Sequence, residues 1–311
     1  MLTKGLFIGV GGSGGGTLRF LWDELESRLR SYGWTEGIPD AWQFLHIDAP
    51  QNVEDGQGDI AHELHDAEHY LGLAKTGVKF SAYTRTLNDE VEVLAGWRPD
   101  PTHDWGPVWL GAGQRRAVGR VIAMANLSDV GERLDQAILK MSGSEASDQL
   151  NRLATKMGVP AVSNAAPVVA LISSLGGGAG AGMLLDISLL LRGHATAGND
   201  FLNDHFTILY PADIFSSFPA ESRTGIAPNT LAGFSELMSA NQHEGAVSEG
   251  DDRILRRAGS AEKVTGNRTA NVNFIMGSRN SEIVLSSPDD VFRSTARGLA
   301  AFLTNPQMVS I

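Results

Sequence analysis

Three glycine-rich stretches and one aspartate are the parts of this sequence best suited to chemistry. The stretches cover residues 11–16, 111–113 and 176–182, and the aspartate is Asp48. Glycine lets a backbone approach a phosphate closely, and free N–H groups at a helix start favour an anion. A carboxylate beside a nucleotide binds a ribose hydroxyl or a magnesium ion. These residues therefore indicate a phosphate cradle.

The stretches are expected at junctions between buried strands and helices. Apolar runs at residues 6–10 and 167–172 predict strands before the first and third stretches, and helical patterns follow both. Further strands are expected at residues 42–47, 206–210 and 272–276. This alternation predicts a Rossmann-like α/β fold, with a mostly parallel sheet and helices on both faces. Ligands bind at the carboxyl edge of such a sheet, where all these features would lie.

Each feature also has a simpler explanation. Glycines between a strand and a helix can serve tight packing, and Asp48 can be an ordinary loop residue. Gly9, Gly11 and Gly14 match the dinucleotide fingerprint, so an NAD(P)-binding oxidoreductase stays an alternative. That alternative leaves two glycine stretches unexplained, and Asp48 lies farther along than the roughly 20 residues expected. The agreement of all three stretches favours the phosphate site.

Polar residues at two predicted helix starts also have expected roles. Arg115 and Arg116 lie in the first turn of a helix, where their charge opposes the helix dipole. A bound polyphosphate would explain this pair, and an ordinary surface pair explains it equally well. Asn229 is expected to cap a later helix.

Composition excludes several classes of protein. The 311 residues carry a formal net charge of −11, which argues against binding to nucleic acid or to an anionic membrane surface. Cysteine is absent, so the chain has neither a disulfide framework nor a thiolate metal site. No apolar run is long enough to insert into a membrane. A cytoplasmic globular protein is the expectation.

The motifs resemble those of one known family. Residues 174–183 read S-L-G-G-G-A-G-A-G-M, which resembles the tubulin signature S-L-G-G-G-T-G-S-G-M. Residues 8–16 resemble the first nucleotide loop of FtsZ, residues 48–49 its second loop and residues 111–113 its third. On these motifs the chain is identified as a divergent prokaryotic tubulin-like member of the tubulin/FtsZ superfamily of self-assembling GTPases.

The resemblance implies that residues 1–311 form one nucleotide-binding domain of the tubulin/FtsZ GTPase type. Residues 227–229 resemble tubulin's E-P-Y-N, and the last predicted helix resembles the central helix that ends this domain. Residues 54–107 are longer than their family counterpart and are expected to contain an insertion, whereas residues 241–270 are expected to be a flexible excursion. The family's C-terminal domain, and the acidic loop that completes the neighbouring subunit's active site, are expected to be absent.

The resemblance further implies GTP or GDP and Mg²⁺ as ligands, and other copies of the same protein as head-to-tail partners. The first and third stretches would hold the phosphates from opposite sides, and the second would sense the γ-phosphate. Asp48 would act near Mg²⁺, while Asn280 and Asp290 would read the base. The implied nucleotide-binding residues are Gly11, Gly12, Ser13, Gly14, Gly15, Gly16, Asp48, Ala112, Gly113, Gln114, Ser174, Gly176, Gly177, Gly178, Ala179, Gly180, Asn280 and Asp290.

Three departures from the family pattern concern activity. Ala179 replaces the signature threonine, Gly16 replaces an asparagine of FtsZ, and Ala227 replaces the ribose-binding glutamate of tubulin. One lost hydrogen bond to a charged group costs about 1.5–3 kcal/mol. The chain is therefore expected to bind a nucleotide but to hydrolyse it slowly. A non-catalytic tubulin-like scaffold for an unknown protein partner stays an alternative.

Overall fold

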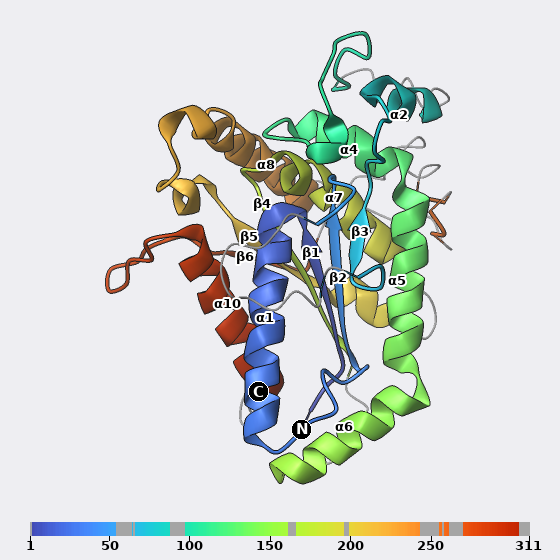
Figure 1. Cartoon of the computed structure of the whole chain (residues 1–311), viewed down its shortest axis with the longest axis vertical. Coiled ribbons are helices and arrows are strands. Elements are labelled where there is room, and N and C mark those ends of the chain that lie inside the picture. The colour runs from blue at the N-terminus through green and yellow to red at the C-terminus, as the bar shows by residue number, and fades with distance from the viewer. Residues whose placement is uncertain are drawn as a thin grey trace.

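The sheet is the centre of the molecule. The computed structural model describes residues 2–53, 64, 66–87, 97–160, 166–195, 199–242, 255–256, 258–260 and 270–304. Within them, six parallel strands form one sheet in the order β3-β2-β1-β4-β5-β6 (Figure 1). The strands are β1 (Gly5–Val10), β2 (Trp42–Asp48), β3 (Tyr70–Gly72), β4 (Val168–Ser174), β5 (Phe206–Tyr210) and β6 (Val272–Ile275). Because β1 lies between β2 and β4, the loops after these three strands meet at one edge.

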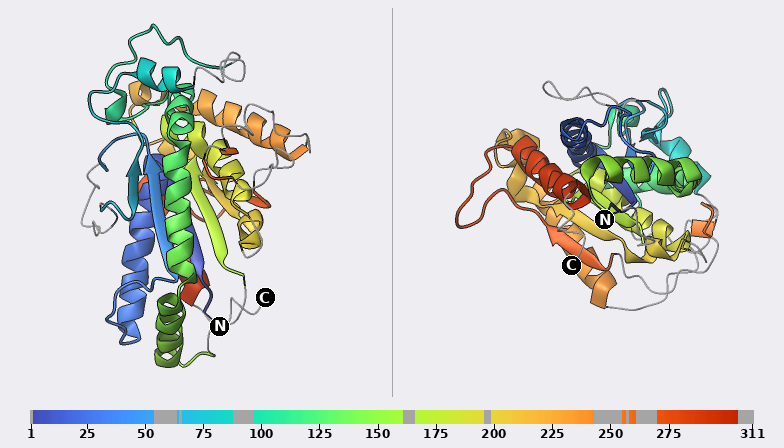
Figure 2. Two further views of the ribbon diagram at one scale, coloured as in Figure 1. Left: turned by 90° about the vertical axis from the view of Figure 1, so that its right-hand side faces the viewer. Right: turned by 90° about the horizontal axis from the view of Figure 1, so that it is seen from below.

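Helices cover both faces of this sheet (Figure 2). On one face, α1 (Gly11–Ser31) packs against α10 (Pro288–Thr304). The other face carries α4 (Arg116–Ala125), α5 (Leu127–Ser142) and α7 (Gly178–Gly193). The remaining elements are α2 (Phe80–Thr86), α6 (Ser144–Met157), α8 (Ile226–Gln242) and the 3₁₀ turns η3 (Val108–Leu110), η4 (Asp200–Asp204), η5 (Ala212–Phe215) and η6 (Ala220–Arg223). Across the described ranges, no helix combines the length and the apolar character needed to cross a bilayer.

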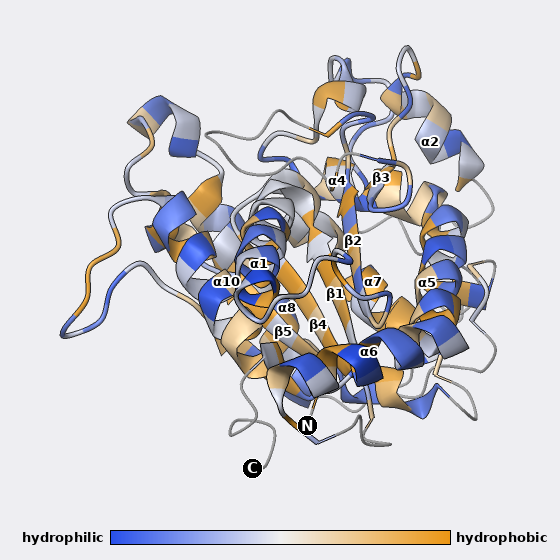
Figure 3. Ribbon diagram, turned by 60° about the horizontal axis from the view of Figure 1, so that its bottom comes forward, coloured by the Kyte–Doolittle hydropathy of each residue, from blue (hydrophilic) through white to orange (hydrophobic). Residues whose placement is uncertain are grey.

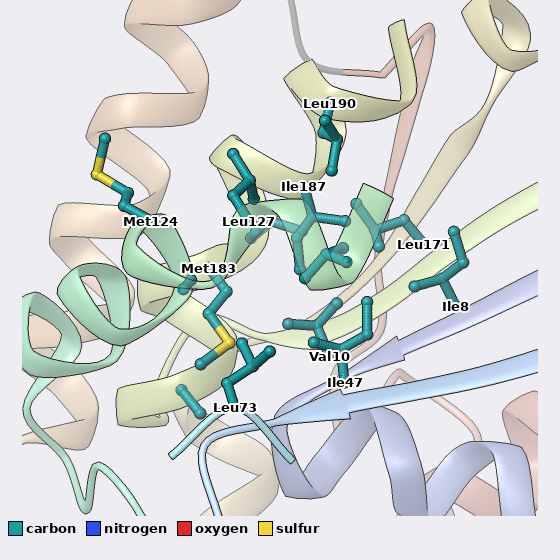
Figure 4. Close-up of a cluster of buried hydrophobic side chains, with 14 of the residues drawn as sticks. Ile8, Val10, Ile47, Leu73, Met124, Leu127, Leu171, Met183, Ile187 and Leu190 are labelled. Carbon is teal, nitrogen blue, oxygen red and sulfur yellow. The ribbon is translucent and has the colours of Figure 1, made fainter. Parts of the chain in front are cut away.

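Successive residues of the strands point alternately into two separate hydrophobic cores, one on each face of the sheet. Ile8 and Val10 of β1 and Ile47 of β2 pack against apolar side chains of α4, α5 and α7, as the cluster in Figure 4 shows. Phe7 and Phe44 point to the opposite face, where their rings stack 5.4 Å apart beneath α1. Figure 3 shows the apolar strands between helices whose outer surfaces are mainly hydrophilic. The central strands are therefore buried on both faces, as is usual in parallel sheets, whereas the edge strand β6 is largely exposed.

The α/β fold class predicted from the sequence is confirmed. The sequence patterns missed β3, which lies within the predicted insertion at residues 54–107 and pairs with the end of β2. The prediction that Asn229 caps a helix is wrong, because α8 begins three residues earlier, at Ile226. Most of the predicted excursion at residues 241–270 lies outside the described residues.

Candidate functional site

A cavity of about 670 Å³ opens where β1, β2 and β4 end. It lies at the carboxyl edge of the sheet, beside the first turns of α1 and α7, so the strand order brings the three glycine stretches together. The predicted site residues that line it are Gly11, Gly12, Ser13, Gly16, Asp48, Ala112, Gly113, Gln114, Ser174, Gly176, Gly177, Gly178, Ala179 and Gly180. We call the part formed by residues 11–13, 48, 111–114 and 174–180 the glycine end.

The three glycine stretches touch one another through their backbones. Gly11 adopts φ +71°, and a Cβ on it would lie 2.7 Å from the nitrogen of Gly180. The N–H of Gly178 donates a hydrogen bond of 2.8 Å to the carbonyl oxygen of Gly113. A Cβ on Gly178 would lie only 2.3 Å from that same oxygen. Larger residues at these positions would force the stretches apart.

At Gly12 and Gly177, by contrast, no close contact within the described part of the chain requires glycine. A Cβ on Gly12 or Gly177 would meet no atom within 4 Å, and neither residue has a positive φ. Both line the cavity, at the starts of α1 and α7. The absence of side chains at these two positions therefore leaves the cavity open at both helix starts. Backbone N–H groups at two helix starts suit an anion such as a phosphate.

We compared the sequence with models of known protein families. Residues 6–310 match the model of a family described as tubulin like. The chain belongs to this tubulin-like family. No curated protein matches the chain.

Two glycines of the first stretch do not line the cavity of this tubulin-like chain. A Cβ on Gly14 would lie 2.4 Å from the carbonyl oxygen of Ile172 in β4. A Cβ on Gly15 would lie 2.1 Å from the ring of His46 in β2. The structure therefore places both residues against the sheet, where they allow α1 to pack closely. Their implied contact with a diphosphate stays a prediction.

A buried histidine that the sequence analysis missed lies beneath the first stretch. His46 is 3% exposed, and its Nε2 lies 3.2 Å from the carbonyl oxygen of Gly11 and 3.6 Å from Oδ2 of Asp48. Oδ1 of Asp48 accepts a hydrogen bond of 2.7 Å from the N–H of Ala49. The sequence did contain a signal for His46, namely its spacing of two residues from Asp48, because residues two apart in a strand share a face.

The surroundings of Asp48 suit a magnesium ion that is held mainly by phosphates and water. Among the described residues, no group of three or more His, Cys, Asp or Glu side chains could hold a metal by itself. Mg²⁺ commonly binds one or two carboxylates together with substrate phosphates and several waters. A single buried carboxylate beside two helix starts fits that pattern.

Two amide side chains join the loops of the glycine end. Nδ2 of Asn229 donates hydrogen bonds of 2.9 Å to the carbonyl oxygen of Gln114 and 3.0 Å to that of Gly176. The side chain of Gln114 accepts a hydrogen bond from the N–H of Gly225 and donates one to the carbonyl oxygen of Ser222. The second and third stretches are thus held to each other and to the start of α8.

Neither arginine of the 115–116 pair lines the cavity. Arg115 stacks over Trp105 at 5.5 Å and donates a hydrogen bond to the carbonyl oxygen of that residue. Arg116 forms an ion pair with Glu236 of α8. The observed partners therefore favour the interpretation as surface residues over a polyphosphate contact.

The opposite part of the cavity is formed by side chains. We call it the α10 end; it is lined by Gly16, Arg19, Ser287, Pro288, Asp289 and Phe292. Neither Asn280 nor Asp290, the implied base-reading residues, lines it. Oδ1 of Asn280 accepts hydrogen bonds from the N–H groups of Glu282 and Ile283, within its own turn.

A buried tyrosine, Tyr210, packs against Phe292 at the α10 end. The ring of Tyr210 lies 5.0 Å from that of Phe292, and its hydroxyl lies 2.8 Å from the hydroxyl of Thr17 in α1. Burial raises the pKa of the Tyr210 hydroxyl to about 12. α1, β5 and α10 therefore meet around one polar group.

Proposed function

We propose that this chain is the guanine-nucleotide-binding domain of a tubulin-like self-assembling GTPase. The observation that supports it best is the pair Gly12 and Gly177, whose missing side chains leave space at two helix starts. Phosphates in that space would accept hydrogen bonds from N–H groups on both sides. The α10 end would then hold the base, because it lies at the other side of the same cavity.

Asp48 would hold Mg²⁺ against the phosphates. The ion, when bound, neutralises charge on the phosphate oxygens. His46 lies behind Asp48 and beside the Gly11 carbonyl, so it would keep this carboxylate and the first stretch in place.

Hydrolysis in this proposal needs a carboxylate from a second subunit. Among the described residues that line the cavity, the carboxylates are Asp48 at the glycine end and Asp289 at the α10 end. If Asp48 is committed to the metal, no other carboxylate of the described lining is left at the glycine end to orient an attacking water. An acidic loop of a neighbouring subunit would supply that group.

Calorimetry and phosphate release test the two parts of the proposal separately. We expect GDP and GTP to bind in the presence of Mg²⁺, and NADH not to displace them. We expect phosphate release by the isolated chain to stay far below roughly 1 s⁻¹, the slow end of ordinary enzyme turnover. Absence of binding would refute the nucleotide site, and fast turnover at low chain concentration would refute the need for a neighbour. Displacement by NADH would favour an oxidoreductase.

A further inference from the structure

The edge strand β6 (Val272–Ile275) exposes apolar side chains. It pairs with β5 alone, so the backbone groups along its other side have no strand partner among the described residues (Figure 1). Val272, Phe274 and Ile275 are 48%, 50% and 45% exposed. Because consecutive strand residues point to opposite faces, neither face of β6 is fully covered. Such an edge is a template for pairing with another chain.

The usual protection of an edge strand is absent from β6. Proteins often place charged side chains or a proline in an exposed edge, and β6 reads Val-Asn-Phe-Ile. Its shortness limits unwanted pairing, which is the structural explanation of an unprotected edge. Shortness does not explain why large apolar side chains are exposed there. The ring of Phe274 also lies 5.6 Å from that of Phe206 in β5, edge to face, so the exposed surface continues towards the core beside α10.

Two exposed carboxylates lie at the ends of this edge. Asp204, just before β5, accepts a hydrogen bond of 2.6 Å from Nδ2 of Asn271, just before β6. Asp213, after β5, accepts hydrogen bonds of 2.7 Å and 2.9 Å from the N–H and the hydroxyl of Ser278, after β6. Neither carboxylate forms an ion pair with a described residue. The apolar edge therefore lies between two negative charges that have only neutral partners.

These charges discriminate between possible occupants of the edge. If two copies of the chain paired through β6 in antiparallel fashion, Asp204 of each copy would approach Asp213 of the other. A parallel pairing would bring identical aspartates together. Both arrangements place like charges opposite each other, which is destabilising. A strand with basic residues at its two ends would instead form ion pairs at both.

We propose that β6 is a docking edge for an extended segment of another protein, which adds a seventh strand and carries Lys or Arg at both ends of an apolar, β-forming stretch. Addition of a strand to an open sheet edge is an established mode of peptide recognition, in which main-chain hydrogen bonds supply affinity. Asn271 and Ser278 lie seven residues apart, which corresponds to about 23 Å in a strand that rises about 3.3 Å per residue. The basic residues of the partner should have a similar separation.

The inference is independent of the proposed nucleotide function, because no residue of β6 lines the cavity. The formal net charge of −11 on the chain also favours the approach of a basic segment over that of a second copy.

A pair of synthetic peptides tests the proposal. The first is Lys-Val-Thr-Val-Thr-Val-Thr-Lys with blocked termini, and the matched control carries glutamate in place of both lysines. We expect the lysine peptide to bind with a Kd below roughly 1 mM and the glutamate peptide not to bind. Fluorescence anisotropy measures the affinities. Hydrogen exchange locates the peptide, which should slow the exchange of backbone amides in β6.

Variants of the chain test the position and the charges separately. Phe274→Lys should weaken the lysine peptide about tenfold or more, because it removes an apolar contact and adds a like charge. Asp204→Asn and Asp213→Asn keep an acceptor oxygen and should each weaken it about two- to fivefold, the effect of one exposed ion pair. Leu139→Lys, at a residue of α5 that is 76% exposed, is the matched control for Phe274→Lys and should change nothing.

Several results would overturn the proposal. They are failure of the lysine peptide to bind, equal binding of the two peptides, and equal binding of the lysine peptide by Phe274→Lys and the wild-type chain. Wild-type dimers in sedimentation experiments that Phe274→Lys abolishes would show that a second copy occupies the edge instead. If Phe274→Lys does not fold, the two asparagine variants still decide the matter, because unchanged affinity in both would refute the role of the charges.

Discussion

The two ends of the cavity are built from different parts of the chain. At the glycine end the surface is mostly backbone, and the stretches are so close that a Cβ on Gly11 or Gly178 would lie within 2.7 Å of a neighbouring backbone atom. At the α10 end the surface consists of side chains, such as Asp289 and Phe292, held by packing and by a helix cap. The shape of the glycine end depends on the absence of side chains at its glycines. The shape of the α10 end depends on the direction in which each side chain points.

The largest expected effect comes from adding a side chain to the glycine end. Gly177→Asp should weaken GDP binding about 100-fold or more, because a carboxylate about 4 Å from a phosphate costs on the order of 4 kcal/mol at an effective dielectric of 20. The same variant should not reduce the melting temperature, since Gly177 is the N-cap of α7, in extended conformation, and aspartate is a favoured cap. Calorimetry and thermal unfolding measure the two effects.

Gly177→Asn is the matched control, because it has nearly the same shape and capping ability without the charge. It should bind GDP more tightly than the aspartate variant. Equal affinity of the two variants for GDP would show that Gly177 does not face a phosphate, and the contrast between the two ends would then lose its basis.

A smaller effect should come from the buried hydroxyl under the α10 end. An unfolded tyrosine ionises near pH 10, whereas burial raises the pKa of Tyr210 to about 12. A raised pKa in the folded state gives stability that is complete below pH 10 and is lost as the pH rises towards 12. The loss should be on the order of 2–3 kcal/mol, because each pKa unit corresponds to about 1.4 kcal/mol.

Urea unfolding between pH 9 and 12 measures this loss. Tyr210→Phe should reduce the pH dependence in that window, whereas Tyr32→Phe, at an exposed tyrosine, should leave it unchanged. If both variants retain the wild-type profile, Tyr210 does not report on the packing between α1 and α10.

The smallest effect concerns Asn229, whose side chain joins two loops of the glycine end. Asn229→Leu removes two hydrogen bonds, to the carbonyl oxygens of Gln114 and Gly176. We expect a loss of about 1–2 kcal/mol in stability and a similar loss in GDP binding free energy. Asn241→Leu on the exposed surface of the same helix should change neither value. Unchanged GDP affinity in Asn229→Leu would mean that the glycine stretches hold their arrangement without this side chain.

The glycine end could be predicted because its cause is local in the sequence. A glycine stretch between an apolar strand and a helix predicts both the turn and the helix start, and the parallel sheet brings such turns together. Even there, the pattern could not distinguish Gly12, which faces the cavity, from Gly14 and Gly15, which face the sheet. That distinction depends on His46 and Ile172, which belong to other strands.

The α10 end could not be predicted to the residue. Asp289 lines the cavity and Asp290 does not, because Asp290 forms hydrogen bonds with the cap residue Ser287, a detail of the helix start. β3 was missed because three residues give too short a pattern. Asn229 was expected to cap a helix, but its side chain instead joins two loops that lie more than fifty residues away in the chain.

The pairing of β1 with β4 determines when the cavity can exist during synthesis. Ser173 donates a hydrogen bond to the carbonyl oxygen of Val10 across a separation of 163 residues. At roughly 5–20 residues per second, a ribosome needs on the order of ten to thirty seconds to make the intervening chain. During that time the first glycine stretch has no opposing stretch, and β1 lacks a neighbour on one side. A ligand that contacts both stretches can therefore stabilise this chain only after the third stretch has left the ribosome.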